Sequence, residues 1–290
     1  MPGGLLNGLR DGLLAAAGDL VLPTRCGGCD RQGMPWCADC GRALAGAPAP
    51  HRWMPTPAPP GLPVVWTALA YQGAVRAGLV NWKDNGRRDL ARVLAPPLTE
   101  ALLAALLACP DGRPVVLVPT PSARSNVRRR GDRPLQSLIR RALAALPPAD
   151  RPRVVPALRL ARRVADQAGL DSQDRARNLA GAMTVAPRFV QQVRGGCCVV
   201  VDDVITTGAT LTEAARALSA AGATGVLAAT VAATQRHTGP ASPVVATAED
   251  HRLGSVPPFP LTGPEQRVAT FAPLGGGDTE PRLTFRREPG

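Results

Sequence analysis

Short apolar runs rich in valine alternate along the chain with stretches whose apolar positions recur at helical spacing. Continuous apolar runs of this length are typical of strands buried on both faces of a parallel sheet. We expect strands at residues 64–71, 115–121, 154–160, 196–203 and 226–233. Helices are predicted at residues 74–86, 89–109, 134–146 and 211–221, with a break in the second at Pro96 and Pro97. This alternation predicts an α/β domain.

The run at residues 196–203 ends in two adjacent carboxylates, Asp202 and Asp203, which a buried strand does not tolerate without partners. A loop follows, and a helical pattern begins at Leu211. The loop residues are Thr206, Thr207, Gly208, Ala209 and Thr210. Backbone N–H groups and hydroxyls at a helix start can hold a phosphate, and carboxylates beside them suit sugar hydroxyls or a magnesium ion. The alternative is an ordinary strand-to-helix loop with a threonine at the helix N-cap.

Four cysteines near the start of the chain have the spacing C-x2-C-x7-C-x2-C. They are Cys26, Cys29, Cys37 and Cys40. Two such pairs can bring four thiolates together at the tetrahedral geometry of a structural zinc site, and folding of this segment should then depend on metal. A redox-active C-x-x-C pair is the alternative. His51 lies nearby and is interpreted as a loop residue, because four cysteines already complete the site.

Composition divides the chain into five parts. Residues 1–22 have apolar positions at helical spacing, interrupted by Asp11 and Asp19, and predict an amphipathic helix rather than a signal peptide. The four-cysteine zinc ribbon spans residues 23–45, a proline-rich linker spans 46–63, and the α/β domain spans 64–235. Residues 236–290 have no sustained periodicity and are expected to form a mostly disordered tail.

Basic residues occupy two positions that suit an anion. Lys83 is the only lysine in a chain with 34 lysine and arginine residues, which hints at a need for a compact ammonium group; a chance surface lysine is the alternative. The strand at 115–121 is followed by a loop with several arginines, including Arg128 and Arg130. Arginines at the carboxyl end of a parallel strand suit a polyanion, with a nucleic-acid backbone contact or a solvated arginine run as alternatives.

The formal net charge of +12 also suits an anionic partner, such as nucleic acid or a polyphosphate ligand. The alternative is that the chain uses arginine in place of lysine almost throughout, and this bias in composition accounts for much of the positive charge without a nucleic-acid partner. No apolar run reaches the roughly 20 residues of a membrane span, and the longest candidate, residues 101–109, has about half that length. Paired cysteines indicate metal binding rather than disulfides, so we expect a cytoplasmic protein.

The stretch from Val199 to Leu211 closely resembles the signature with which type I phosphoribosyltransferases bind phosphoribosyl pyrophosphate (PRPP). Together with other motifs in the same order, it resembles the ComF family, a competence-associated branch of phosphoribosyltransferase-like proteins. The resemblance covers residues from about 5 to 235. Its other motifs are the N-terminal helix, the four-cysteine segment, Tyr71-x-Gly73, Lys83-x-x-Gly86, Val118-Pro119-x-Pro121, Arg128-Arg129-Arg130-Gly131, Gln167, Arg175 and Asn178.

Two positions depart from the family pattern. Asp132-Arg133 stands where the family often has Phe-Asn, and Val164 stands where it often has threonine. Both departures fall in regions that should contact ligand, and both leave the phosphate loop unchanged.

The resemblance implies a type I phosphoribosyltransferase-like fold, with a mostly parallel central sheet, helices on both faces and a small N-terminal zinc ribbon. It implies that Asp202 and Asp203 hold the ribose hydroxyls of PRPP, that residues 206–210 hold its 5′-phosphate, and that Mg2+ accompanies it. Lys83 is assigned to the same ligand. Pyrophosphate would leave toward Arg128 and Arg130, and Zn2+ would be structural. The family is also linked to uptake of transforming DNA with a helicase-like partner.

Two functions follow as hypotheses. The first is an enzyme that transfers phosphoribose from PRPP to an unidentified nitrogen acceptor. The second is a non-catalytic PRPP- or nucleotide-binding adaptor that contacts a helicase partner or single-stranded DNA. Aromatic residues make up only 3% of the chain, so few side chains can stack on bases, which argues against strong direct binding of single strands. Release of pyrophosphate from PRPP discriminates between the two.

Overall fold

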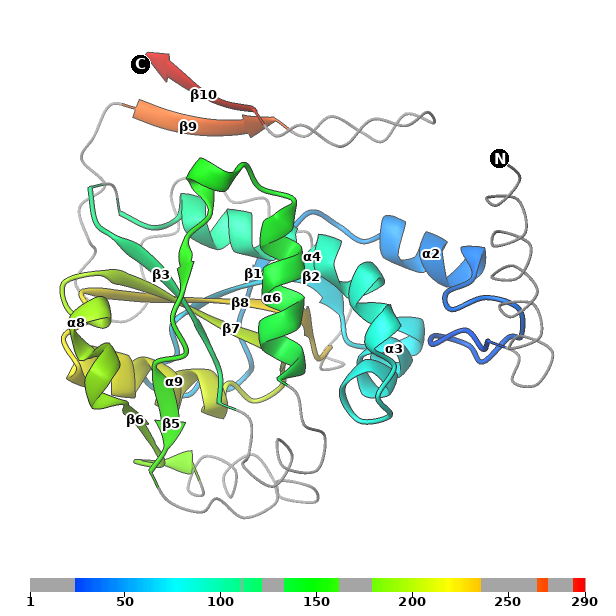
Figure 1. Ribbon diagram of the computed structural model, residues 1–290, viewed down its shortest axis with the longest axis horizontal. Helices are drawn as coiled ribbons and strands as arrows, with labels where there is room; N and C mark the ends of the chain where they lie inside the picture. Colours follow the sequence, from blue (N-terminus) through cyan, green and yellow to red (C-terminus); the bar gives the residue numbers. More distant parts are fainter. Residues whose placement is uncertain are drawn as a thin grey trace, which may run out of the picture. The chain divides into compact units, whose positions relative to one another are not determined.

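A six-stranded sheet forms the centre of residues 1–235 in the computed structural model (Figure 1). The structure describes residues 24–110, 112–121, 133–161 and 179–235, and the backbone of 265–270 and 284–289. The sheet contains β1 (His51–Trp53), β2 (Val64–Ala70), β3 (Val115–Pro119), β4 (Arg153–Val154), β7 (Cys197–Ile205) and β8 (Gly225–Ala233). Their spatial order is β1-β2-β8-β7-β3-β4, and every pairing is parallel except that of β1 with β2.

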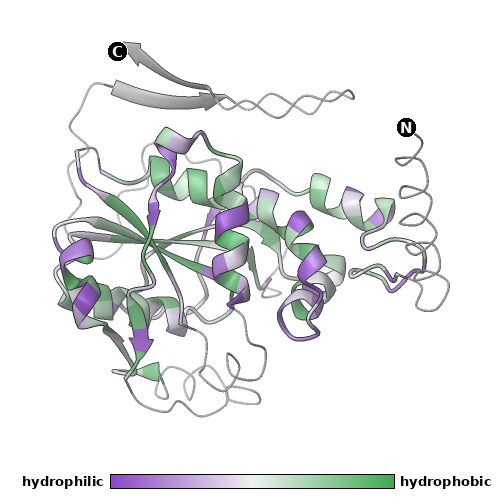
Figure 2. Ribbon diagram, viewed as in Figure 1, coloured by the Kyte–Doolittle hydropathy of each residue, from purple (hydrophilic) through white to green (hydrophobic). Residues whose placement is uncertain are grey.

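The two central strands, β7 and β8, are apolar because both of their faces are covered. Val199, Val200 and Val201 are fully buried in β7, and Figure 2 shows the central strands as mainly hydrophobic. Successive side chains of a strand point to opposite faces of its sheet. Cys198 and Val200 belong to the core cluster that includes Leu211 of helix α9 (Ala209–Ala220). Cys197 instead contacts Cys109, just after helix α4 (Ala91–Leu107). Helices α4 and α9 therefore cover opposite faces, as expected for this fold class.

Helix α4 corrects one prediction from the sequence. It runs without a break through Pro96 and Pro97, after a 3-10 turn, η1, at Arg88–Leu90. Two prolines remove two backbone donors, but burial compensates: Leu94, Leu98 and Leu102 are buried where α4 packs on β2, β8 and helix α6 (Pro134–Ala144).

Helix α4 also tests the expectation from the sequence that no apolar segment reaches the length of a membrane span. Among the described residues, only the helical stretch Arg88–Leu107 has the length and apolar composition of a membrane span. It is longer than the apolar run expected from the sequence, and 56% of its most apolar window is buried inside the protein. Its apolar side chains are therefore explained by the core of the α/β domain.

Residues 153–160 form two short strands rather than the single strand expected. β4 (Arg153–Val154) extends the main sheet beside β3, whereas β5 (Leu158–Leu160) pairs antiparallel with β6 (Met183–Val185) in a separate two-stranded sheet. Pro156 lies between β4 and β5 and has no N–H group to donate to a ladder, so the chain changes direction there. The β5–β6 pair is followed by a 3-10 turn, η3 (Pro187–Phe189), and by α8 (Val190–Val193).

The proline-rich segment at 46–63 contains β1, which pairs with β2 at the edge of the main sheet. Before it, the cysteine segment ends in helix α2 (Ala38–Ala45), and β2 is followed by helix α3 (Gly73–Lys83).

The predicted N-terminal helix at residues 1–22 lies outside the described residues. In the second compact unit, residues 236–290, β9 (Glu265–Thr270) and β10 (Thr284–Pro289) pair antiparallel, within the segment expected to be a disordered tail.

Candidate functional site

The two adjacent acids lie at the carboxyl end of β7, beside the end of β3. Parallel pairing aligns Pro119 of β3 with Val201 of β7, so Thr120 follows directly beside Asp202. The Thr120 hydroxyl donates to Oδ1 of Asp202 at 2.9 Å, and the backbone N–H of Asp203 donates to the same oxygen at 2.9 Å. Asp202 is therefore fixed through one oxygen, and its Oδ2 atom accepts no hydrogen bond from the described residues.

Asp203 points to a different partner. Nζ of Lys83, the last residue of α3, lies 2.9 Å from Oδ1 and 2.7 Å from Oδ2 of Asp203. The Asp203 side chain is buried, while the Lys83 side chain is half exposed. The structure thus brings the single lysine of the chain to the acidic pair predicted as the ligand site. The ammonium group balances one of the two negative charges.

These contacts give the two acids different pKa values. Burial and the neighbouring Asp203 carboxylate raise the pKa of Asp202 from its ordinary 3.8 to about 7. Burial also acts to raise the pKa of Asp203, but the Lys83 ammonium overcomes this and holds it below its ordinary value. Burial opposes the charged form of Lys83, yet the Asp203 and Asp202 carboxylates raise its pKa. Near neutral pH, Asp203 and Lys83 are ionised, and Asp202 is close to half-protonated.

The loop after β7 turns sharply at Gly208, which is the N-cap of α9 and has a φ of 82°. Only glycine adopts this left-handed conformation without strain. A β-carbon at Gly208 would also lie 2.8 Å from Cδ1 of Leu62, so the proline-rich segment closes directly over the loop. The Thr207 hydroxyl accepts from the N–H of Ala209 at 3.4 Å, and the first backbone bond of the helix runs from Thr212 to Gly208. The N–H groups of Thr210 and Leu211 consequently have no acceptor within the helix.

A small cavity of about 30 Å³ lies in this loop. Its lining consists of Asp202 and residues 204–211, which include all five predicted phosphate-binding residues. Unpaired N–H groups at a helix start and the positive end of the helix dipole both favour an anion. The volume is about that of two water molecules, so it suits one compact group such as a phosphate.

The four cysteine sulfurs converge in the manner expected of a zinc site. Their Sγ atoms all lie within 4.8 Å of one another, with 3.7 Å between Cys26 and Cys40 and 3.6 Å between Cys29 and Cys37. Four sulfurs held about 2.3 Å from one zinc ion lie about 3.8 Å apart in a regular tetrahedron. Burial acts to raise the pKa of Cys26, but N–H groups of Cys37 and Gly28 lower it to about 6, which favours the thiolate. Both the donor set and the spacing fit Zn2+.

This cysteine cluster packs on helix α3. The ring of Trp36 lies so close to the helix that a β-carbon at Gly78 would be 2.8 Å from it. The Asn81 amide donates to the carbonyl of Gly27 at 2.9 Å. Because Lys83 ends the same helix, the cysteine cluster supports the element that presents the ammonium group to Asp203.

Several predicted ligand residues cannot be placed. Arg128 and Arg130 lie outside the described residues, as do Gln167, Arg175 and Asn178. Conversely, two residues at the site were not singled out from the sequence. Thr120 orients Asp202, and its only sequence signal is its place after an apolar run. Buried Glu213 of α9 accepts from the N–H of Met183 at 2.8 Å and pairs with Arg216, which ties the β5–β6 pair to the helix that starts at the phosphate loop.

Comparison with known families gives one match. A family model described as a phosphoribosyl transferase domain matches residues 154–251, about a third of the chain. The match includes β7, the acidic pair, the loop, α9 and β8. A search of curated proteins gives no match. The chain therefore carries a phosphoribosyltransferase domain in a mixed α/β fold, together with a four-cysteine cluster near its N-terminus.

Proposed function

We propose that the acidic pair and its loop bind PRPP with Mg2+, and that the protein transfers the phosphoribosyl group to a nitrogen nucleophile. The observation that carries the proposal is the small cavity, whose lining joins Asp202 to residues 206–210. A sugar phosphate needs hydroxyl acceptors and a phosphate cradle within a few ångströms of each other. Both are adjacent in this loop, within the part of the chain that matches the phosphoribosyltransferase domain.

The proposed ligand pose follows from the chemistry of each group. Thr206, Thr207 and Thr210 would donate hydroxyl hydrogens to the 5′-phosphate, together with the free N–H groups at the start of α9. The free oxygen of Asp202 would accept a ribose hydroxyl, and Asp203 would accept the second from its position beside Lys83. Mg2+ fits this oxygen-rich set of ligands and would neutralise charge on the diphosphate.

Transfer would break the bond between the anomeric carbon and the diphosphate oxygen and form a carbon–nitrogen bond to the acceptor. The proton of the acceptor nitrogen goes to solvent, and pyrophosphate leaves. Positive charge develops on the ribose ring during bond breaking, and the carboxylates of Asp202 and Asp203 stabilise it. Arg128 and Arg130, assigned from the sequence, are proposed to bind the departing pyrophosphate.

Isothermal titration of the full chain with PRPP and Mg2+ tests the binding step. We expect saturable binding to one site, and loss of at least tenfold in affinity for Asp203→Asn and for Thr207→Ala. Asp150→Asn is the matched control, because Asp150 is exposed on a 3-10 turn far along the chain from the loop. Absence of PRPP binding to the folded wild-type protein contradicts the proposal. Pyrophosphate release with a panel of nitrogen bases then tests transfer.

The resemblance to the ComF family supports a cellular role in the uptake of transforming DNA. We propose that PRPP binding serves that role. Replacement of the chromosomal copy by the Asp202→Asn, Asp203→Asn double variant should lower transformation frequency at least tenfold while protein levels stay unchanged. Unchanged transformation with the double variant counts against this cellular role and leaves the biochemical proposal standing.

A further inference from the structure

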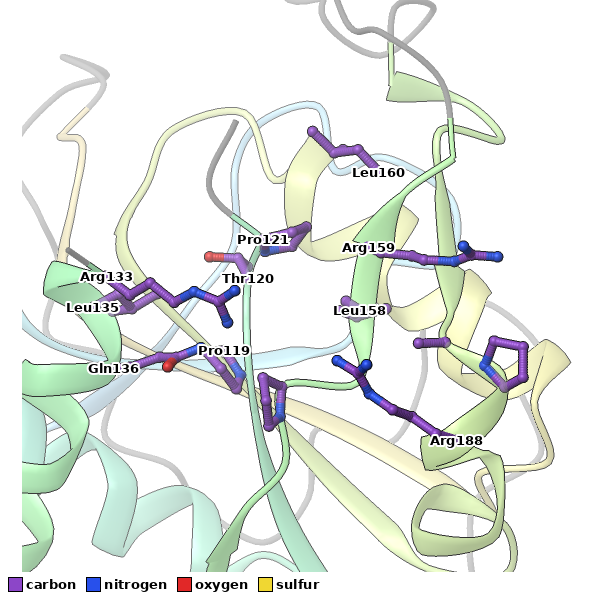
Figure 3. Close-up of a pocket in the computed structure, with 13 residues that line it drawn as sticks. Pro119, Thr120, Pro121, Arg133, Leu135, Gln136, Leu158, Arg159, Leu160 and Arg188 are labelled. Atoms are coloured by element: carbon purple, nitrogen blue, oxygen red, sulfur yellow. The ribbon is translucent and has the colours of Figure 1, made fainter. Parts of the chain in front are cut away.

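A second, larger cavity of about 690 Å³ lies beside the acidic pair (Figure 3). Its walls come from the end of β3, the start of α6, β5 and η3. Thr120 lines this cavity and also donates its hydroxyl hydrogen to Asp202. The cavity therefore shares a wall with the proposed ribose site. Its volume is in the range of small-molecule sites.

The described residues that line this cavity carry charge of one sign. They include Arg133, Arg159 and Arg188 and no acidic residue. Within the described ranges, none of these three guanidinium groups contacts a carboxylate; Arg188 lies over the ring of Phe189. Figure 3 shows Arg133 and Arg188 pointing toward one another from opposite sides of the cavity, while Arg159 points away. Two unpaired guanidinium groups that converge on one space favour an anionic group there.

The rest of the described lining is mostly apolar, with Thr120 and Gln136 as its other side-chain donors. Leu135, Leu158 and Leu160 contribute side chains, and four of the thirteen lining residues are prolines. Proline has no backbone N–H group, so these positions cannot donate to the many oxygens of a diphosphate. Flat apolar walls suit a planar ring instead. The described lining residues also include no aromatic side chain, which the stacking of single-stranded nucleic acid requires.

We propose that this cavity binds the acceptor, and that the acceptor is a small planar ring compound with a carboxylate group. The inference rests on the proposed phosphoribosyl transfer. The ring packs between the leucines and prolines, the carboxylate pairs with Arg133 and Arg188, and the acceptor nitrogen, in the ring or attached to it, faces the ribose site past Thr120. The two arginines thereby select an acid over its neutral counterpart.

Matched pairs of probes test this selection. The full chain is titrated with orotate and uracil, nicotinate and nicotinamide, and anthranilate and 2-aminobenzamide, with and without saturating Mg2+ and PRPP. We expect at least one acid to bind ten times or more tightly than its neutral counterpart. Arg133→Gln and Arg188→Gln should each remove most of this preference. Arg140→Gln is the control, because Arg140 is exposed on the same helix α6 and bonds to Ser137.

The outcomes separate this inference from the proposed function. If PRPP binds but no acid is preferred, or if the Arg133→Gln, Arg188→Gln double variant keeps the preference, the acceptor assignment is wrong. Inorganic pyrophosphate is titrated as a further probe. If the double variant no longer binds it while its affinity for ring acids is unchanged, the cavity is a diphosphate site. If ring acids bind with the expected preference but PRPP does not bind at all, the cavity holds an acid and the proposed transfer fails. Circular dichroism verifies that each variant is folded.

Discussion

Lys83 and Asp203 are 120 residues apart in the chain, yet the ammonium nitrogen of one lies within 2.9 Å of both carboxylate oxygens of the other. The pair joins the last residue of α3 to the end of β7, so it links the cysteine-supported helix to the strand that carries the acids.

Replacement of Lys83 by methionine leaves buried Asp203 without its counter-charge. Because Lys83 holds the pKa of Asp203 below its ordinary 3.8, the pair contributes stability above about pH 4 and loses it as pH falls further. We expect the free energy of unfolding to drop by about 1–2 kcal/mol at pH 8, since Lys83 is half exposed. Urea unfolding at pH 8 and at about pH 2 measures this, with Arg76→Met on the same helix as control. An equal loss at both pH values would argue against an electrostatic origin.

Asp202→Asn should produce opposite effects on stability and on ligand binding. The pKa of Asp202 is raised to about 7, so the folded state favours its protonated form and loses stability as pH rises from about 4 to 7. Asparagine is neutral at every pH and can still accept from Thr120. We expect the melting temperature of the ligand-free variant to match wild type at about pH 4 and to exceed it at pH 8, while PRPP affinity falls.

The same pKa predicts a pH-dependent affinity in the wild type. Ribose hydroxyls and Mg2+ favour the ionised carboxylate, so binding releases a proton below pH 7. Affinity for Mg2+ and PRPP should then fall by up to roughly tenfold per pH unit below 7, beyond the change caused by the phosphates of PRPP themselves. Titrations in two buffers of different ionisation enthalpy measure the protons released. Asp202→Asn provides the reference, and an identical slope in variant and wild type would show that Asp202 does not titrate on binding.

Gly208→Ala forces a β-carbon into a left-handed backbone and into contact with Leu62. We expect a loss of about 1–3 kcal/mol in the free energy of unfolding together with weaker PRPP binding, because the phosphate loop must shift. Gly222→Ala is a matched control, since Gly222 has a φ of 92° but follows the opposite end of α9. That variant should lose stability and keep its PRPP affinity. Equal PRPP affinity in both variants would show that this loop does not bind PRPP.

The cysteine cluster should hold about one zinc ion per chain, measured by elemental analysis of the purified protein. Cys37→Ser should abolish zinc binding. His51→Ala should leave the zinc content unchanged, because His51 belongs to β1 and its ring nitrogen lies 3.4 Å from the carbonyl oxygen of Ala49. Metal removal should speed hydrogen exchange in α3, where Trp36 packs on Gly78. It should also weaken PRPP binding through Lys83. Unchanged exchange in α3 after complete metal removal would show that the cluster does not support this helix.

Local patterns predicted most of the strands and helices and the position of the loop between β7 and α9. Valine-rich runs identified β7 and β8, because strands covered on both faces must be apolar along their whole length. The predictions failed where burial or chain direction outweighed local preference. Packing keeps α4 helical through Pro96 and Pro97, and Pro156 divides a run that otherwise resembles one strand.

Long-range contacts at the site could not be predicted in the same way. The neighbours of Asp202 and Asp203 depend on strand order and on which helix ends beside the sheet, and neither is encoded in the loop sequence. Thr120 and Lys83 come within reach of the acids only because β3 is adjacent to β7 and α3 follows β2. Its status as the only lysine marked Lys83 as a candidate, and the resemblance to a known family added to this, whereas nothing local distinguished Thr120 from other threonines.

The order of strands also sets the order in which the molecule can be completed during synthesis. β8 is the last strand of the main sheet in the sequence, yet it lies between β2 and β7. Until Gly225 and the residues after it leave the ribosome, the inner edges of β2 and β7 have no partner. At roughly 5–20 residues per second, the interval between Ala70 and Gly225 lasts on the order of 10 to 30 seconds. For most of that time the nascent chain exposes the unpaired apolar edge of β2, and the edge of β7, which ends at Ile205, is added only shortly before Gly225. Chaperones that bind such edges therefore have a defined window in which to act.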